Sequence, residues 1–283
     1  MESILIVARP IVKDNPAYIL LQKDNKFTKY FLIKDEPFCI EKVDNTRYCN
    51  GWYDITTHNN HPCEHNQKVD GKYSCCFSCR QKTAFNPAFY NTNEISDVPA
   101  KYNKQEHSVY ISYFANGMAK AGIMSDSRGI DRIYEQGALL YVILASFDTA
   151  EQAHHLEAKL INKGLKNSIT KKQKETTLSR IIDVDIEKDV FGSILSSLNL
   201  DMELEINSNL DHFFYGKYLA EAVTPLSDQL VSGHIVAVVG RYLIISNNNR
   251  LFGFWLDKLN GYKVNITKKI ETIDIEPMQV SLF

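Results

Sequence analysis

The stretch HSVYISYFANGMAKAG, residues 107–122, decides the fold of the middle of the chain. Its Val-Tyr-Ile and Tyr-Phe-Ala runs favour strands. The pair Asn116-Gly117 is the strongest short signal for a hairpin turn, because both central turn positions need a positive φ. We therefore predict two antiparallel strands, over about 107–115 and 118–124, that meet at this pair.

Three further elements are expected after the hairpin. Apolar residues at helical spacing predict a short helix over about 127–136. The nearly continuous apolar run 138–147 predicts a strand that is buried on both faces or nearly so. A capping box that begins at Thr149 and a stop at Gly164 predict a helix over about 150–163.

Glu157 lies inside the apolar stripe of this last helix, between Leu156 and Ile161. A carboxylate on a buried face is costly unless a cation or a metal ion pairs with it. Either such a partner is present, or the helix packs at an edge. Arg132, on the polar face of the preceding helix, is a candidate partner.

These residues resemble the GIY-YIG nuclease domain, in which a hairpin carries two tyrosines, a helix supplies an arginine and a later helix supplies a metal-binding glutamate. Tyr110, Arg132 and Glu157 stand at three of these positions. Lys120 stands where the second tyrosine is expected, just before a glycine. The resemblance implies an α+β fold class, with a hairpin and helix core over about 105–180.

The same resemblance implies a chemistry. Phosphodiester hydrolysis needs an activated water, neutralisation of the phosphoryl charge and help for the leaving group. By resemblance, Glu157 would bind one divalent cation, with Mg²⁺ expected, and Arg132 would hold the phosphate. Tyr110 would lie near the attacking water, with His107 close by. Lys120 could neutralise the phosphate, and could act as a base only if burial or nearby cations lowered its pKa.

The wider chain is similar to domain-of-unknown-function family 2797. That family combines a cysteine-rich cluster with the motifs His-x-Val-Tyr, Lys-x-Gly and Arg-x-x-x-Gln-Gly-Ala, a later glycine-bounded strand, and Gly-Tyr-x-Val. The corresponding motifs here lie at residues 107–110, 120–122, 132–138, 233–243 and 261–264. The resemblance covers roughly residues 60–270 and implies a family without a demonstrated function.

Composition places few limits on function. A chain of 283 residues suffices for one or two domains with an ample core. Its net charge of −2 gives no overall bias towards nucleic acid. No apolar run of 18 residues is present, so no membrane partner is expected. The first ten residues, MESILIVARP, favour a strand rather than a signal peptide, and we expect a cytoplasmic protein.

Both ends of the chain are rich in short β-forming runs separated by turn residues. Residues 1–57 and residues 230–283 each contain a few such runs, too few to cover their own apolar faces. We therefore predict that the two segments form one β-sheet or barrel. The rest of the chain would be inserted between them, and residues 181–229 would form an acidic, partly helical connector.

Four of the six cysteines fall within residues 63–79. The spacing Cys63-x-His65-x10-Cys76-x2-Cys79 is that of a zinc knuckle. We predict a structural zinc site with these four ligands, in a knuckle over residues 58–90.

Alternatives for this site remain open. Cys75 could replace Cys76, and His61 could replace His65. Disulfides are not expected without a secretory signal. The remaining cysteines, Cys39 and Cys49, are interpreted as ordinary buried or half-buried residues.

Residues 154–180 contain seven Lys and Arg against two Glu, a local charge of +5, whereas residues 183–211 contain eight acids and one Lys. A basic strip beside the candidate site suits a nucleic-acid backbone, DNA or RNA, although a solvated loop explains it equally well. The residues assigned to nucleic-acid binding are Arg128, Lys159, Lys163, Lys166, Lys171, Lys172 and Lys174.

Three functions are compatible with these patterns: a zinc-containing Mg²⁺-dependent endonuclease, a nucleic-acid-binding module that keeps the fold without cleavage, and a structural or protein-interaction protein. Fold resemblance does not decide between them. Lys120 in place of tyrosine favours the second over the first. Both nucleic-acid functions would be favoured over the structural one if four side chains converged in one cleft: Tyr110, Lys120, Arg132 and Glu157.

Overall fold

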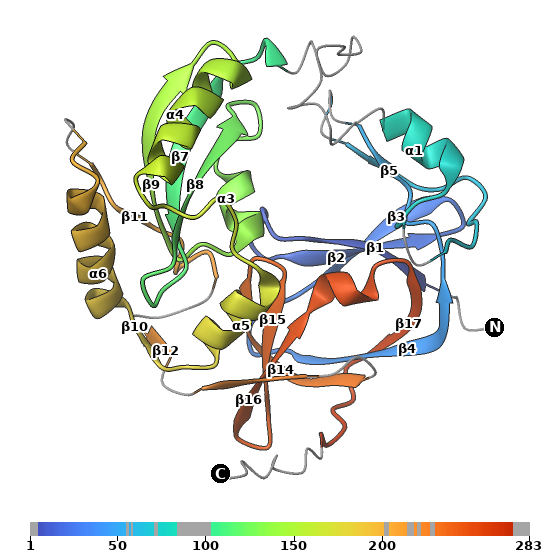
Figure 1. Ribbon diagram of the computed structural model, residues 1–283. Helices are drawn as coiled ribbons and strands as arrows, with labels where there is room; N and C mark the ends of the chain where they lie inside the picture. The colour runs from blue at the N-terminus through green and yellow to red at the C-terminus, as the bar shows by residue number, and fades with distance from the viewer. Residues whose placement is uncertain are drawn as a thin grey trace, which may run out of the picture.

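Two β-sheets, a large one built from both ends of the chain and a small one built from its middle, carry the α+β fold (Figure 1). The computed structural model describes residues 5–54, 57, 59–70, 73–83, 103–200, 204–213, 218–219, 222–226 and 230–273. Residues 84–102, which precede the hairpin, lie outside this set.

The large sheet has nine strands in the order β13-β16-β15-β14-β4-β17-β1-β2-β3. The strands before the middle segment are β1 (Leu5–Ile11), β2 (Tyr18–Lys23), β3 (Lys26–Phe31) and β4 (Pro37–Arg47). Those after it are β13 (Val223–Pro225), β14 (Leu230–Val239), β15 (Tyr242–Asn247), β16 (Arg250–Trp255) and β17 (Tyr262–Thr267). Only the edge pair β13–β16 is parallel among the described pairs of this sheet.

The two ends of the chain are joined by β4 and β17. β4 lies between β14 and β17, and β17 also pairs with β1. Strands of residues 1–57 and of residues 230–283 therefore lie in one sheet, while the domain boundaries themselves stay predictions.

One face of the large sheet covers a core of its own. Alternate residues of its strands point into this core, because successive side chains of a strand project to opposite faces. Examples are Val7, Ile19, Phe38, Leu243 and Phe254, all of them buried. Both chain ends supply this core, so neither end completes it alone.

The small sheet has the order β11-β9-β7-β8 and is antiparallel throughout. Its strands are β7 (His107–Tyr113), β8 (Ala119–Ser125), β9 (Leu140–Phe147) and β11 (Asn207–Ser208). At the predicted turn, the Met118 N–H donates to the Ala115 carbonyl at 3.0 Å, and Asn116 and Gly117 have φ of 51° and 70°. The predicted hairpin is thus confirmed. The expected burial of β9 on both faces is wrong at Ile143, which is 43% exposed.

Five α-helices are described: α1 (Phe77–Thr83), α3 (Asp131–Gln136), α4 (Ala150–Asn162), α5 (Lys171–Leu178) and α6 (Val184–Ser197). The Thr149 hydroxyl caps α4 by accepting from the Gln152 N–H, as the capping box predicts. α3 is shorter than expected, because residues 126–130 form turns. Within the described part of the chain, no helix has the length and apolar character to cross a membrane.

The short elements are β5 (Trp52–Tyr53), β6 (Asn60–His61), β10 (Ile182–Asp183), β12 (Tyr218–Leu219) and the 3₁₀ helix η2 (Leu256–Leu259). β5 pairs with β6, and β10 pairs with β12.

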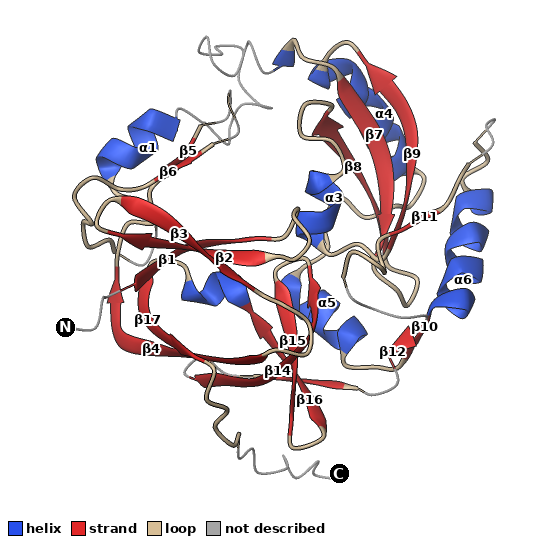
Figure 2. Ribbon diagram, turned by 180° about the vertical axis from the view of Figure 1, so that it is seen from behind, coloured by secondary structure: helices blue, strands red, loops and turns tan. Residues whose placement is uncertain are grey.

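The two sheets share a second core. Residues on the other face of β14–β16, such as Val239, Tyr242 and Ile244, pack in one cluster with Val109 and Ile111 of β7. α3 lies between the sheets in both views (Figures 1 and 2).

A glycine pair forms the closest approach at this junction. A Cβ at Gly240 would lie 2.6 Å from the Gly137 nitrogen, so a side chain there would push α3 away from the large sheet.

Candidate functional site

Four buried cysteines, Cys49, Cys63, Cys76 and Cys79, converge beside the large sheet, with their sulfurs all within 4.8 Å of one another. Cys49 follows β4, Cys63 follows β6, and the other two flank the start of α1. A tetrahedral zinc with Zn–S bonds of about 2.3 Å would place its sulfurs about 3.8 Å apart. The cluster could therefore hold a metal ion such as zinc.

Backbone N–H groups point at two of these sulfurs. Cys49 Sγ accepts from the Cys76 N–H at 3.2 Å, and Cys63 Sγ accepts from the N–H groups of His65 and Gln67. Such hydrogen bonds favour the thiolate, which is the form that binds a metal. Burial opposes them and raises the pKa of the Cys49 thiol to about 12.

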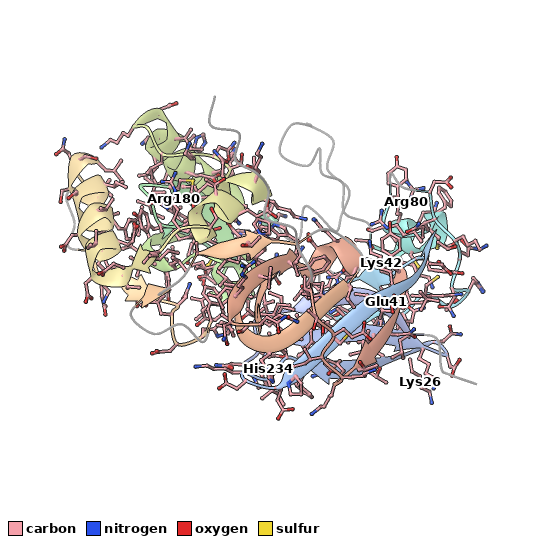
Figure 3. The ribbon with its side chains drawn as sticks, turned by 90° about the horizontal axis from the view of Figure 1, so that it is seen from below. Lys26, Glu41, Lys42, Arg80, Arg180 and His234 are labelled. Carbon is pink, nitrogen blue, oxygen red and sulfur yellow. The ribbon has the colours of Figure 1, made fainter. Side chains whose placement is uncertain are left out.

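The fully buried Gln22 side chain ties this cluster to β2. It accepts from the Cys63 N–H at 3.1 Å and donates to the Cys63 carbonyl at 3.3 Å. Figure 3 shows Arg80 of α1 and Arg180, which follows α5, on opposite sides of the molecule. The cluster thus lies at one end of the molecule, and α6 lies at the other (Figure 1).

The cluster that the structure brings together differs from the predicted ligand set, because it contains Cys49 and does not contain His65. The His65 backbone turns towards Cys63 while its side chain is exposed. Cys49 is consequently not an ordinary buried cysteine, although Cys39, in β4, lies outside the cluster.

The two alternative ligands also lie outside the cluster. His61 stacks on Trp52, with ring centroids 4.1 Å apart, and Cys75 is only partly buried. Residues 58, 71–72 and 84–90 of the predicted knuckle lie outside the described residues.

A second candidate site, which we call the hairpin pocket, lies against β7 and β8 and has a volume of about 310 Å³. All four side chains that the nuclease resemblance singles out line it, together with one histidine and one asparagine. The polar lining residues are Tyr110, Lys120, Arg132, His154, Glu157 and Asn167.

The register of the hairpin explains how two of these side chains meet. Tyr110 stands opposite Gly122, and Ser112 stands opposite Lys120. Tyr110 and Lys120 are therefore diagonal neighbours on one face of the sheet. The Tyr110 ring also covers position 122, where a Cβ would lie 2.5 Å from the Tyr110 hydroxyl oxygen. The His-x-Val-Tyr and Lys-x-Gly motifs thus form one packed unit.

The two cations of the hairpin pocket face one carboxylate. Burial and the nearby Arg132 together lower the pKa of Lys120 to about 8, while Glu157 opposes the shift. The buried Glu157 contacts His154 Nδ1 at 2.7 Å. Because the hairpin pocket has two cations and only one carboxylate among its described lining residues, it suits an anionic ligand.

The hydroxyl of Tyr110 is held in place from α3. It accepts from Gln136 Nε2 at 2.6 Å. Burial raises the pKa of Tyr110, so its phenol stays protonated near neutral pH.

The expected catalytic His107 does not line the hairpin pocket. It is buried, with Nδ1 at 2.8 Å from the Gln105 carbonyl. Because it stands three residues before Tyr110, strand alternation directs it to the opposite face. The structure brings His154 there instead, one turn before Glu157 on α4, a helical spacing that sequence reasoning overlooked.

The predicted basic strip is only partly available to a ligand. Lys163 Nζ donates to the Leu198 carbonyl at 2.5 Å, and Lys171 Nζ lies 2.6 Å from an Asp257 carboxylate oxygen. Lys174 Nζ donates to the Gln136 carbonyl at 2.5 Å. The other strip lysines are exposed: Lys159, Lys166 and Lys172.

Arg128 belongs to a third cavity, which we call the arginine pocket, of about 190 Å³. Its charged lining residues are Arg9, Lys13, Arg128, Asp131, Glu135 and Arg241. Arg132 lines the hairpin pocket whereas Asp131 and Glu135 line this one, so the two pockets lie on different sides of α3.

The fold and these sites define an α+β protein with a four-cysteine cluster and a cation-bearing pocket at a β-hairpin. The chain belongs to the family described as protein of unknown function (DUF2797), whose model matches residues 42–264. That match includes the cysteine cluster and every lining residue of the hairpin pocket. No curated protein and no solved structure matches the chain.

Proposed function

We propose that the hairpin pocket binds a phosphodiester of a nucleic acid and that Glu157 holds a divalent cation for its hydrolysis. The observation that carries this proposal is the meeting of Tyr110, Lys120, Arg132 and Glu157 in one pocket. They come from two strands and two helices, and together they offer a phosphate clamp and a metal ligand.

The order of elements supports the same reading. A hairpin, a helix, a strand and a second helix follow one another over residues 107–162, with β7 between β8 and β9. This is the arrangement expected from the resemblance to the GIY-YIG nuclease domain.

The residues fit a divalent cation that arrives with its substrate. Mg²⁺ is usually held by one or two carboxylates, several waters and substrate phosphates. Glu157 is the one carboxylate among the described lining residues, and His154 contacts one of its oxygens. Lys120 and Arg132 disfavour a bare cation nearby until a phosphate neutralises them. When bound, such an ion would activate a water and polarise the phosphoryl group.

The protein's own residues then have distinct tasks. Arg132 binds two phosphoryl oxygens through its planar fork, and Lys120 neutralises the remaining charge. Tyr110, held by Gln136, orients the water. His154 fixes the orientation of the Glu157 carboxylate.

A nucleic-acid-binding module without cleavage is the second candidate function. Lys120, at the position of a tyrosine in the nuclease domain, favours it, because an additional cation strengthens phosphate binding without supplying a hydroxyl. Both candidates share the same pocket and the same phosphate contacts.

We further infer that the cysteine cluster binds zinc in a structural role. All four ligand positions would be filled by protein sulfurs, which leaves no place for a water or a substrate.

The proposal is tested by fluorescence anisotropy with labelled single-stranded DNA, duplex DNA and RNA, at 50 and 200 mM salt. Binding should fall steeply with salt, since it would depend on Lys and Arg. Arg132→Gln should weaken binding about tenfold, the loss of one charged hydrogen-bonded contact. Lys188→Gln, which alters an exposed lysine of α6 outside the basic strip, is the matched control and should change binding far less.

Cleavage is measured on the same oligonucleotides with Mg²⁺ or Mn²⁺. Glu157→Gln should bind at least as tightly as the wild type and should not cut. Failure of the wild type to bind any of the three nucleic acids overturns the proposal. Binding without cleavage by the wild type rejects hydrolysis and establishes the binding module.

A further inference from the structure

The arginine pocket collects cations from separate parts of the chain. Arg9 lies in β1, Arg128 lies in the turn before α3, and Arg241 lies between β14 and β15. Lys13 follows β1 and completes the set. Four cations that converge on about 190 Å³ need compensating negative charge.

The carboxylates of the pocket supply only part of that charge. Asp131 lies 3.4 Å from Lys13. Glu135 forms an ion pair with Arg128 and also lies 3.6 Å from Arg241. Two carboxylates therefore serve four cations, and one of the two is shared.

Arg9 is the cation left over. Its guanidinium lies 5.2 Å from the centre of the Tyr53 ring, and no ion pair with it is found among the described residues. Burial lowers the pKa of Arg9, and the nearby Arg241 lowers it further. The charged form of Arg9 is thus less stable here than in water.

Two buried polar atoms of the pocket's lining residues also have no hydrogen-bond partner within the described part of the chain. They are Nε of Arg241, a donor, and Oδ1 of Asn60, an acceptor. Native proteins rarely leave such groups unsatisfied without a water, an ion or a ligand. An oxyanion would accept from Arg241 and balance the excess charge.

We propose that the arginine pocket binds a phosphoryl group, held by the guanidinium groups of Arg9, Arg128 and Arg241. Arginine forks match phosphate oxygens in geometry and bind them by paired hydrogen bonds. The volume corresponds to roughly six waters at about 30 Å³ each, which leaves room for one phosphoryl group with a few waters.

This inference deepens the proposed function and rests on it in one respect, the assignment of the phosphoryl group to a nucleic-acid strand. Lys174 connects the two pockets. The cations that lower its pKa electrostatically include Lys120 and Arg132 of the hairpin pocket and Arg241 of the arginine pocket. Cations therefore continue from one pocket to the other across α3, whose width is about 10 Å. One strand could place a second phosphate in the arginine pocket.

The first measurement is an NMR titration of the arginine Nε–H signals with inorganic phosphate, at constant ionic strength maintained with chloride. We expect the signals of Arg9, Arg128 and Arg241 to shift together and to saturate with one dissociation constant. Arg9→Gln and Arg241→Gln should weaken this binding at least tenfold. Arg132→Gln, in the other pocket, and Arg250→Gln, at an exposed position of β16, should leave it within twofold.

Two variants separate an anion site from an ion-pair network that only holds the fold. Glu135→Gln removes a carboxylate that competes with phosphate for Arg128 and Arg241, so phosphate should bind at least threefold more tightly. Arg9→Lys keeps the charge without the fork and should bind measurably but more weakly. Arg9→Lys also takes the place of Arg9→Gln as the test variant if Arg9→Gln does not fold. No saturable shift in the wild type, or no gain in Glu135→Gln, overturns the inference.

The source of the phosphoryl group is decided with the labelled oligonucleotides. If a strand supplies it, Arg9→Gln should reduce by about one the slope of log binding constant against log salt. Phosphate binding without oligonucleotide binding would leave this pocket assigned to a small phosphorylated molecule and would reject the proposed function. Oligonucleotide binding that Arg9→Gln leaves unchanged, with no phosphate titration, would reject this inference and leave the proposed function standing.

Discussion

The cysteine cluster and the hairpin pocket differ in whether their polar groups find partners within the protein. In the cluster, four buried sulfurs face one another, and backbone N–H groups and Gln22 surround them. In the hairpin pocket, two cations and one carboxylate line a cavity of about 310 Å³. The cluster is complete within the protein, whereas the pocket has room and charge for something else.

This difference indicates what each region does. A closed site with four protein ligands stabilises a fold, since no position remains for a reactant. A ligand that enters a cavity with unbalanced charge stabilises the folded protein. The comparison predicts large stability effects from the cluster and smaller ones, coupled to ligand binding, from the pockets.

The largest effect is expected from Cys49→Ser. Loss of one of four thiolate ligands should abolish zinc retention and lower the free energy of unfolding by about 4–5 kcal/mol, as is typical when a structural metal is lost. Elemental analysis of protein purified without added metal and urea unfolding measure the two quantities. About one zinc per chain is expected in the wild type.

Two neighbours serve as matched controls. Cys75→Ser and His65→Ala change residues that lie outside the cluster, so zinc content should stay the same and stability should change by under about 1 kcal/mol. Zinc loss in His65→Ala, with zinc retained in Cys49→Ser, would restore the ligand set that the sequence spacing suggests.

A smaller effect is expected from Gly122→Ala in the hairpin pocket. The new Cβ would meet the Tyr110 hydroxyl at 2.5 Å, and overpacking of this kind costs about 1–3 kcal/mol. The displaced ring should also weaken nucleic-acid binding. Urea unfolding and anisotropy provide the two readouts.

Gly192→Ala is the matched control with the opposite sign. Gly192 lies in α6, and a Cβ there would meet no atom within 4 Å apart from its chain neighbours and the backbone of its own helix. Alanine in a helix interior should stabilise the protein by about 1 kcal/mol. Equal effects of the two substitutions would show that the Tyr110 ring does not require a glycine opposite it.

The last effect appears only as a change of stability with pH and concerns the largely buried lysine between the two pockets. Burial, together with the nearby Lys120 and Arg132, lowers the pKa of Lys174 to about 7. Between pH 7 and its ordinary value of 10.5, the unfolded chain binds a proton that the folded chain has released. The free energy of unfolding contributed by this group therefore rises with pH in that window, by about 2 kcal/mol from pH 7 to pH 9.

Below pH 7 Lys174 is protonated in both the folded and the unfolded chain, so the folded chain bears the full cost of burying the charge. Lys174→Met should flatten the rise in stability between pH 7 and pH 9, measured by urea unfolding at each pH. Lys172→Met, two residues earlier and exposed, should leave the slope unchanged. Identical slopes in the wild type and Lys174→Met would contradict the lowered pKa.

Local signals in the sequence predicted much of the fold. Asn116-Gly117 identified the hairpin because a positive φ at two successive positions suits few other residue pairs. Thr149 marked the start of α4 through its own hydrogen bond. The convergence of four pocket residues followed from the hairpin and from the apolar stripe around Glu157.

The missed residues are those that only tertiary structure brings together. Cys49 lacks a ligand neighbour at knuckle spacing, so the sequence favoured His65. Arg9 and Arg241 come from opposite ends of the chain and meet only because the large sheet joins those ends. His107 lies away from the hairpin pocket for a simpler reason: successive side chains of a strand point to opposite faces, and His107 stands three residues before Tyr110.

The pairing of β1 with β17 has a consequence for synthesis on the ribosome. β1 emerges first, but its partner begins at Tyr262, some 250 residues later. At about 5–20 residues per second, the first strands would wait roughly 10–50 s for that partner. The hairpin and its helices, whose contacts are local, can form in the meantime. During this interval β1 to β4 expose apolar side chains, so a nascent chain that stalls before β17 is the form most in need of a chaperone.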